Sequence, residues 1–165
     1  MPRPIESLHQ MNANVHHETF TVLADAEKAL ADYGIALDDA LVVEGDYSFD
    51  DGFRGARKLL ALAQRPTAIF GSNDEIAAGV LAAARAGGLN VPYDLSIAGF
   101  EDSPFSKQSW PALTTAKQAT EDIGRLAARR LLADIREQAL TVQANTGINP
   151  ELVVRGSTAP PRPNS

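Results

Sequence analysis

The sequence predicts an α/β fold with a mainly parallel sheet and helices on both faces. Three observations lead to this fold class. Short apolar runs alternate with longer segments of helical spacing, glycine or proline separates most segments, and 44% of the 165 residues are hydrophobic, which is enough for a substantial core. Strands that alternate with helices imply right-handed crossovers and a sheet that is covered on both sides.

The N-terminal part has the weakest pattern. Residues 1–17 show no clear hydrophobic period and carry all three histidines, so we expect an irregular segment. A helix is predicted from about Glu18 to Tyr33, with Gly34 as its stop. Ala40 to Val43 is predicted to form a short buried strand.

The central part alternates more regularly. Helices are predicted over Phe49–Ala63 and Asp74–Ala86, with a strand at Thr67–Phe70 between them. Pro66 closes the first connection, because the residue before a proline disfavours the helical conformation. Gly87-Gly88 ends the second helix. One side of that helix carries small residues that permit close packing against a sheet or a partner helix: Ala77, Ala78, Gly79, Ala82 and Ala83.

The C-terminal part is predicted to add strands at Leu95–Gly99, Leu113–Lys117 and Leu152–Arg155. A long helix is expected from Thr120 to about Gln138, and its apolar stripe consists of Ile123, Leu126, Ala127, Leu131 and Ile135. We expect a loop at Leu140–Asn149 and a frayed tail at 160–165.

Composition excludes several classes of function. The chain has no cysteine, so disulfides and thiolate metal sites are excluded. A formal net charge of -6 and a pI of about 5.0 argue against a nucleic-acid-binding face. The first residues lack the apolar stretch of a secretory signal, and no apolar run approaches the roughly 20 residues that span a bilayer. We therefore expect a cytoplasmic protein without membrane contact.

Catalytic and metal chemistry finds little support. His16 and His17 are adjacent and cannot share one helix face, so a metal site with His9 is not expected. Ser72 follows a predicted strand, but F-G-S-N-D lacks the G-x-S-x-G pattern of a nucleophile elbow, and no histidine follows it. Dinucleotide-binding and P-loop motifs are absent. We expect no enzyme activity, no metal and no cofactor.

Polar residues gather where one predicted strand ends. The apolar run Ala68-Ile69-Phe70 stops at Gly71, and Ser72, Asn73 or Asp74 can cap the helix that follows. Open α/β sheets bind ligands at the carboxyl ends of their strands, so this end is a candidate site. The same residues are also ordinary helix caps, and both interpretations stay open.

Four ordered motifs give a more specific indication. They are P-T-A-I-F-x-S-N-D-x-x-A-x-G at Pro66–Gly79, G-L-x-V-P-x-D-L-S-I-x-G-F at Gly88–Phe100, P-x-L-T-T-x-x-Q at Pro111–Gln118 and L-V-V-R-G-S-T-A at Leu152–Ala159. With these motifs the chain closely resembles the effector-sensing domain of the LacI/GalR family of bacterial transcription regulators. The resemblance covers about Val42 to Ala159 and is weak before that.

The resemblance implies one lobe of a periplasmic-binding-protein-like type I fold, formed by residues 18–159. In family members a helix-turn-helix, a hinge and a first sensor lobe precede this segment, and none is recognised here. Val22 stands about where the family has a ligand-clamping arginine. Either the chain is a piece of a longer regulator or it is a natural remnant with a divergent start, and the sequence leaves both open.

Carried over position by position, four residues would face the ligand cleft. Tyr47 matches an aromatic residue that stacks on a sugar or base, and ordinary packing is its alternative. Asn73 matches a ligand-binding asparagine, whose amide suits a hydroxyl-rich ligand. Glu101 stands where the family usually has aspartate and can accept charge-assisted hydrogen bonds, with a polar turn as its alternative. Gln118 either binds the ligand or braces the crossover.

The resemblance also implies a function. The intact protein would sense a small sugar-like or nucleoside-like effector and would bind DNA only through a domain absent from this chain. A homodimer is expected through the Asp74–Ala86 helix region, although core packing explains its small residues as well. The alternative is a stand-alone solute-binding or protein-interaction module of the same fold.

Overall fold

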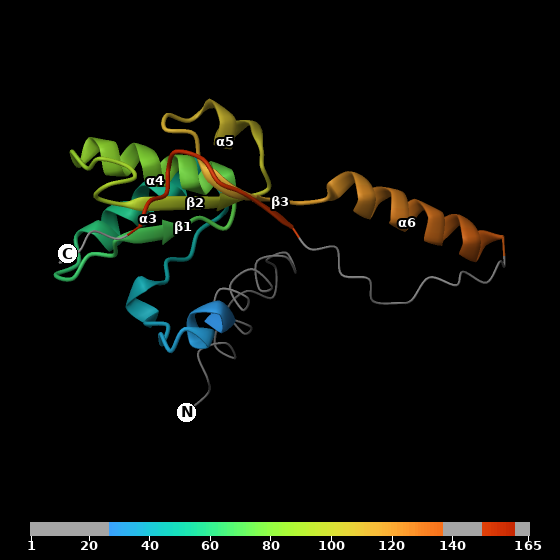
Figure 1. Ribbon diagram of the computed structural model, residues 1–165, viewed down its shortest axis with the longest axis horizontal. Helices are drawn as coiled ribbons and strands as arrows, with labels where there is room; N and C mark the ends of the chain where they lie inside the picture. The colour runs from blue at the N-terminus through green and yellow to red at the C-terminus, as the bar shows by residue number, and fades with distance from the viewer. Residues whose placement is uncertain (1–26, 137–149, 161–165) are drawn as a thin grey trace.

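The computed structural model describes residues 27–136 and 150–160 of the chain. A helix over 27–32 is followed by η1 (Asp39–Leu41), α3 (Phe49–Leu60), β1 (Ala68–Phe70), α4 (Asp74–Ala86), β2 (Ser96–Phe100), α5 (Pro104–Gln108), β3 (Thr114–Lys117), α6 (Thr120–Ile135) and β4 (Glu151–Val153). The strands form one sheet in the order β1-β2-β3-β4, in which β1, β2 and β3 are parallel and β4 is antiparallel to β3 (Figure 1). The predicted α/β fold class with a mainly parallel sheet is confirmed.

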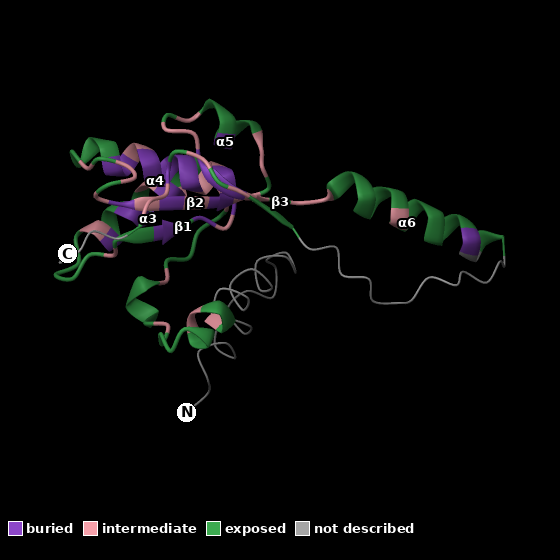
Figure 2. Cartoon of the chain, viewed as in Figure 1, coloured by how far each residue is buried: buried purple, intermediate pink, exposed green. Residues whose placement is uncertain are grey.

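The core lies between α4 and the sheet. α4 contacts β1 and β2, and it also contacts α3 and α5. Ile69 and Ile97 are paired in register on β1 and β2, and both belong to the buried cluster that includes Leu81 and Leu113. Figure 2 shows the buried residues concentrated in α4 and the neighbouring strands. The two residues of β1 on either side of Ile69 are exposed to solvent, and Phe70 is 47% exposed.

Two glycines let α3 and α4 cross at backbone distance. A Cβ atom on Gly79 of α4 would lie 2.1 Å from the carbonyl oxygen of Phe49, and one on Gly52 of α3 would lie 2.2 Å from that of Ile76. Eight of the 13 residues of α4 are buried. Core packing of the small residues is therefore confirmed. The homodimer that was expected through the Asp74–Ala86 helix region stays a prediction.

α6 lies in a different environment, because it extends away from the sheet (Figure 1). Its predicted apolar stripe is present, yet Ile123 is 47%, Leu131 61% and Ile135 68% exposed. The residues that the structure describes thus leave most of this stripe open to solvent (Figure 2).

One predicted strand is wrong. The segment Ala40–Val43 contains the end of η1 followed by irregular chain, and Val43 is 37% exposed. The carboxylate of Asp38 accepts a hydrogen bond from the amide of Ala40 at 2.9 Å, and this local bond stabilises a helical turn in place of a strand. Among the described residues, no other strand pairs with the outer edge of β1.

One helix was missed in the sequence. The segment E-D-S-P, expected as a polar turn, leads into α5, whose cap is Ser103 and whose first residue is Pro104. Proline at the first helical position is favoured because its fixed backbone angle suits a helix start and its missing N–H is not needed there.

The expected irregular segment 1–17 and the expected loop Leu140–Asn149 lie outside the described residues. The predicted helix from Glu18 is described only from residue 27, and its stop Gly34 has a φ of 72°.

Candidate functional site

The carboxyl ends of the three parallel strands form one rim of the sheet, which we call the polar rim. Asn73 follows β1 after a short turn, while Glu101 directly follows β2 and Gln118 directly follows β3. Since these strands are parallel neighbours, the three residues leave the sheet at the same edge. Tyr47 joins them, because its carbonyl oxygen accepts a hydrogen bond from the side-chain amide of Asn73 at 3.1 Å. The structure thus brings the four predicted site residues to one rim, and their contact with a ligand stays a prediction.

Asn73 has a defined structural role. It is 8% exposed and caps α4, with Oδ1 accepting a hydrogen bond from the amide of Ile76 at 2.7 Å. The helix-cap interpretation is therefore confirmed. Because its Nδ2 donates to Tyr47, the same side chain also fixes the loop before α3 to the start of α4. An asparagine amide has a second N–H and a second oxygen lone pair, so its capping role leaves hydrogen-bonding capacity for a ligand.

The loop that carries Tyr47 is held in addition by the carboxylate of Asp51. Tyr47 is half-buried and has a φ of 64°, in the left-handed region. Ser48 follows and caps α3, and the carboxylate of Asp51 accepts hydrogen bonds from the hydroxyl of Ser48 and the amide of Asp46, both at 2.8 Å. The hydrogen bond from Ser48, followed by that from the Asp46 amide, lowers the pKa of Asp51. These bonds fix the backbone on both sides of Tyr47.

Glu101 lies in a turn of unusual backbone conformation. Its φ is 106° and that of Asp102 is 57°, although neither residue is glycine. The amide of Glu101 donates to the carbonyl oxygen of Ala116 at 2.8 Å, which continues the pairing of β2 with β3 beyond the last strand residue. The Glu101 residue itself is exposed at the polar rim.

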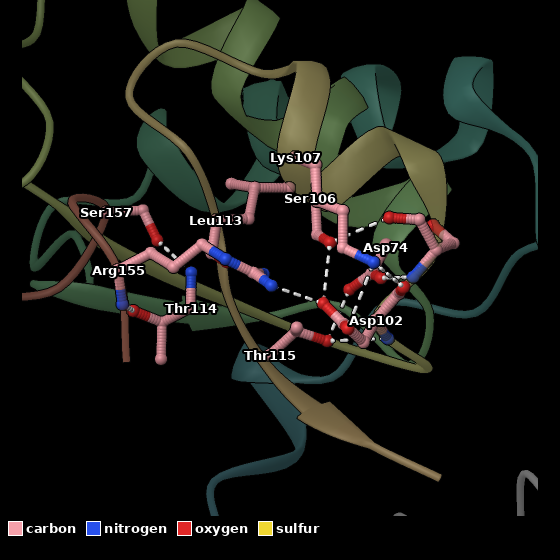
Figure 3. A network of polar contacts seen from close by, with 10 residues as sticks. Asp74, Asp102, Ser106, Lys107, Leu113, Thr114, Thr115, Arg155 and Ser157 are labelled. Atoms are coloured by element: carbon pink, nitrogen blue, oxygen red, sulfur yellow. Dashed lines mark hydrogen bonds and ion pairs between the residues drawn. The ribbon is translucent and has the colours of Figure 1, made fainter. Parts of the chain in front are cut away.

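A buried carboxylate at the start of α4 supports this turn from below. Asp74 is 0% exposed, and its Oδ1 accepts a hydrogen bond from the hydroxyl of Thr115 at 2.6 Å while Oδ2 accepts one from the amide of Ser103 at 2.7 Å (Figure 3). A Cβ atom on Gly99 would lie 2.3 Å from Asp74 Oδ1. Glycine in β2 is therefore what leaves room for this carboxylate.

Asp102 forms a second charged centre beside the first. Its carboxylate pairs with the guanidinium of Arg155, from the segment after β4, and with Lys107 Nζ at 3.1 Å. Burial raises the pKa of Asp102, but hydrogen bonds and charges from Arg155 and Lys107 outweigh burial and leave this pKa below its ordinary value. Arg155 also donates to the Leu113 carbonyl at 2.8 Å, so the final segment is tied to the start of β3.

Sequence reasoning missed this supporting network. Asp74, Thr115 and Arg155 all stand within the four motifs, but the family resemblance singled out only Tyr47, Asn73, Glu101 and Gln118 as site residues. A usable signal exists in the L-T-T segment, since two threonines within a buried strand need hydrogen-bond partners. Their partners here are Asp74 and the C-terminal segment.

The polar rim suits a ligand with hydroxyl groups. It combines an amide, a carboxylate and a phenol ring, which together offer donors, acceptors and an apolar face. Within residues 27–136 and 150–160 no group of three or more metal-ligating side chains is present. In the same part of the chain, no helix has the length and apolar character needed to cross a bilayer.

Comparisons with known proteins identify the family. A model described as a periplasmic binding protein-like domain matches residues 11–158. The chain is 44% identical over 105 residues to catabolite control protein A of Priestia megaterium, covering 64% of this chain and 32% of that protein. A solved complex of the transcriptional regulator CelR with cellobiose is 33% identical, with a TM-score of 0.73 and coverage of 79% of this chain and 40% of that one. A lac repressor dimer bound to its operator and an anti-inducer is 32% identical, with a TM-score of 0.72 and coverage of 82% and 46%.

These three relatives are regulators rather than enzymes, and the chain spans less than half of the length of each. The family model covers most of the chain, including all the elements that build the polar rim. The chain therefore belongs to the periplasmic binding protein-like domain family, as part of the effector-binding domain of LacI/GalR-type transcription regulators.

Proposed function

We propose that the polar rim is one half of an effector site in a LacI/GalR-type transcription regulator. The observation that carries this proposal is the gathering of Tyr47, Asn73, Glu101 and Gln118 at the carboxyl ends of the three parallel strands. In open α/β sheets this edge is where ligands bind. The effector is a small sugar-like or nucleoside-like molecule, because its hydroxyl groups would pair with the carboxylate and amide while its ring stacks on the aromatic side chain.

The second half of the site comes from a first sensor lobe that precedes this segment in the intact protein. The exposed stripe of α6 supports this proposal, since an amphipathic helix is stable when its apolar side is buried. α6 begins three residues after β3 and stands off from the sheet, as a segment that belongs to a neighbouring lobe would (Figure 1). Closure of the two lobes around the effector would then favour one of two regulator conformations and change the affinity for DNA.

DNA binding itself is assigned to a part of the regulator outside this chain. The net charge of -6 supports this assignment, because a duplex attracts basic surfaces. Since the regulator acts on DNA, the protein is cytoplasmic.

The regulator would be a homodimer through the Asp74–Ala86 helix region, in which the segment beside α4 supplies the exposed contact residues. α5 contacts α4, and Phe105 of α5 is 43% exposed while the nearby Trp110 is 79% exposed. Large exposed aromatic residues are typical of protein interfaces. Sedimentation at micromolar concentration checks this: Trp110→Ala is expected to weaken the dimer, and Tyr33→Ala, at another strongly exposed aromatic residue, is expected to leave it intact.

Calorimetry tests the effector site. A version of the protein extended to include the preceding lobe is titrated with a panel of sugars and nucleosides, including cellobiose. We expect one class to bind and Glu101→Ala to weaken it at least tenfold, as the loss of a charge-assisted hydrogen bond does. Arg85→Ala, at an exposed charged residue in the last turn of α4 and thus at the opposite end of that helix from Asn73, is the control. No binding across the panel, or equal affinities in both variants, contradicts the proposal.

A further inference from the structure

The turn after β2 is held by three consecutive backbone amides, those of residues 101–103. Their acceptors are the carbonyl oxygen of Ala116, Thr115 Oγ1 and Asp74 Oδ2, at 2.8, 3.3 and 2.7 Å. Two of the three acceptors are side-chain atoms, and they come from β3 and from the first residue of α4. Figure 3 shows two of these acceptor residues, Asp74 and Thr115, close to Asp102 of the turn.

This turn requires external support. Glu101 and Asp102 both have positive φ values, 106° and 57°, and such conformations cost on the order of 1 kcal/mol or more for residues other than glycine. They persist when the surrounding structure determines them. Here the determining contacts are the three amide hydrogen bonds, because they fix the direction of each successive peptide group.

The hydroxyl of Thr115 has a central part in this arrangement. It donates to Asp74 Oδ1 at 2.6 Å and accepts from the amide of Asp102 at 3.3 Å, so it connects the carboxylate to the turn. Thr115 and Asp74 are both 0% exposed. Neither side chain is accessible to an effector, so both can influence binding only through neighbouring residues, and the turn is the group that both of them contact.

We propose that Asp74 and Thr115 are positioning residues of the effector site, which hold the left-handed turn and thereby set the direction in which Glu101 presents its carboxylate. This inference rests on the proposed function of the polar rim. It also accounts for the space that Gly99 leaves beside Asp74. Specificity for the effector would then depend on two side chains that the effector never touches.

Thr114 supplies a matched control for Thr115. The two threonines are consecutive on β3 and both are buried, at 5% and 0% exposure. Thr114 Oγ1, however, accepts a hydrogen bond from the amide of Arg155 at 3.0 Å and forms one with the hydroxyl of Thr158. It therefore holds the C-terminal segment and makes no contact of this kind with the turn. Replacement of either threonine by valine removes one hydroxyl at constant shape.

The experiment measures φ and amide exchange in the complete 165-residue chain by NMR, with no ligand added. In Thr115→Val we expect the amide of Asp102 to exchange about tenfold faster, the factor produced by the loss of one hydrogen bond. The HN–Hα couplings of Glu101 and Asp102 should leave their left-handed values. In Thr114→Val the amide of Arg155 should exchange faster while residues 101–103 are unchanged. Thr115→Ser, which keeps the hydroxyl, should behave as the wild type does.

A second variant keeps the test decisive if Thr115→Val does not fold. Asp74→Asn retains an oxygen for Thr115 but presents an N–H donor to the Ser103 amide, so that amide alone should exchange faster. Unchanged couplings and exchange rates at residues 101–103 in both variants would overturn the positioning role. A wild-type protein with this turn intact and no effector binding would instead contradict the proposed function and leave the turn's geometry as found.

Discussion

α4 and α6 have similar lengths and both have apolar residues at helical spacing, yet the structure puts them in opposite environments. α4 is enclosed by the sheet, α3 and α5, and its Leu81 is 4% exposed. α6 extends from the sheet, and its Leu131 is 61% exposed (Figure 2). The difference shows that the spacing of apolar residues predicts which side of a helix becomes buried. It does not predict whether the segment that covers this side belongs to the same domain.

The largest expected effect comes from truncating one leucine on each helix. Leu81→Ala should lower the free energy of unfolding by about 3 kcal/mol, because it leaves a cavity in the core. Leu131→Ala should change it by less than about 0.5 kcal/mol, as exposed positions do. Urea unfolding of the 165-residue chain measures both values. Equal losses of unfolding free energy in the two variants would contradict the difference between α4 and α6. In a version that includes the preceding lobe, Leu131→Ala is expected to become destabilising.

The two helices also offer a matched pair of glycines. Gly79→Ala should destabilise the protein by roughly 1–3 kcal/mol, since the added Cβ would overlap the backbone of Phe49 and force the helices apart. Gly124→Ala on α6 should stabilise it by roughly 0.5–1 kcal/mol, because the site is open and alanine is the better helix former. Thermal unfolding followed by circular dichroism shows whether each substitution lowers or raises the stability. A stabilising Gly79→Ala would contradict the close crossing.

The smallest expected effect concerns acid stability. Because the folded-state pKa of Asp102 is lowered, its stabilising contribution is fully present above the unfolded value of about 3.9 and is lost as pH falls through the folded pKa. The free energy of unfolding should therefore fall less steeply in Asp102→Asn than in the wild type as the pH drops below about 4. Asp122→Asn on α6, whose 3.6 Å ion pair with Arg125 is exposed, serves as the control. If both variants keep the wild-type slope, the Asp102 ion pairs do not stabilise the fold.

Much of the fold could be predicted from sequence because its signals are local. α4 begins and ends where predicted, at Asp74 and Ala86, since a capping asparagine and a pair of glycines bound it. The four observed strands differ from their predicted bounds by at most two residues at each end, because their short apolar runs are also local signals. The predicted strand at Ala40–Val43 failed because a strand needs a neighbouring strand, and short-range patterns carry no information about one.

The site could be predicted only in part. The family resemblance singled out Asn73 and Glu101 as candidates, but it did not reveal that Asn73 caps α4 and binds the Tyr47 loop at the same time. The buried contact between Asp74 and Thr115 joins residues 41 positions apart, and no sequence pattern specifies such a pairing. Long-range hydrogen bonds of this kind become visible only when the sheet order is known.

The central claim is that the carboxyl edge of the sheet, and not its amino edge, binds the effector. NMR titration of the lobe-extended protein with the calorimetric panel tests it most directly. The account predicts that a binding compound shifts the amide signals of Tyr47, Asn73, Glu101 and Gln118 and leaves those of Asn90 and Ala112, which precede β2 and β3, in place. Shifts confined to Asn90, Ala112 and their neighbours would contradict it.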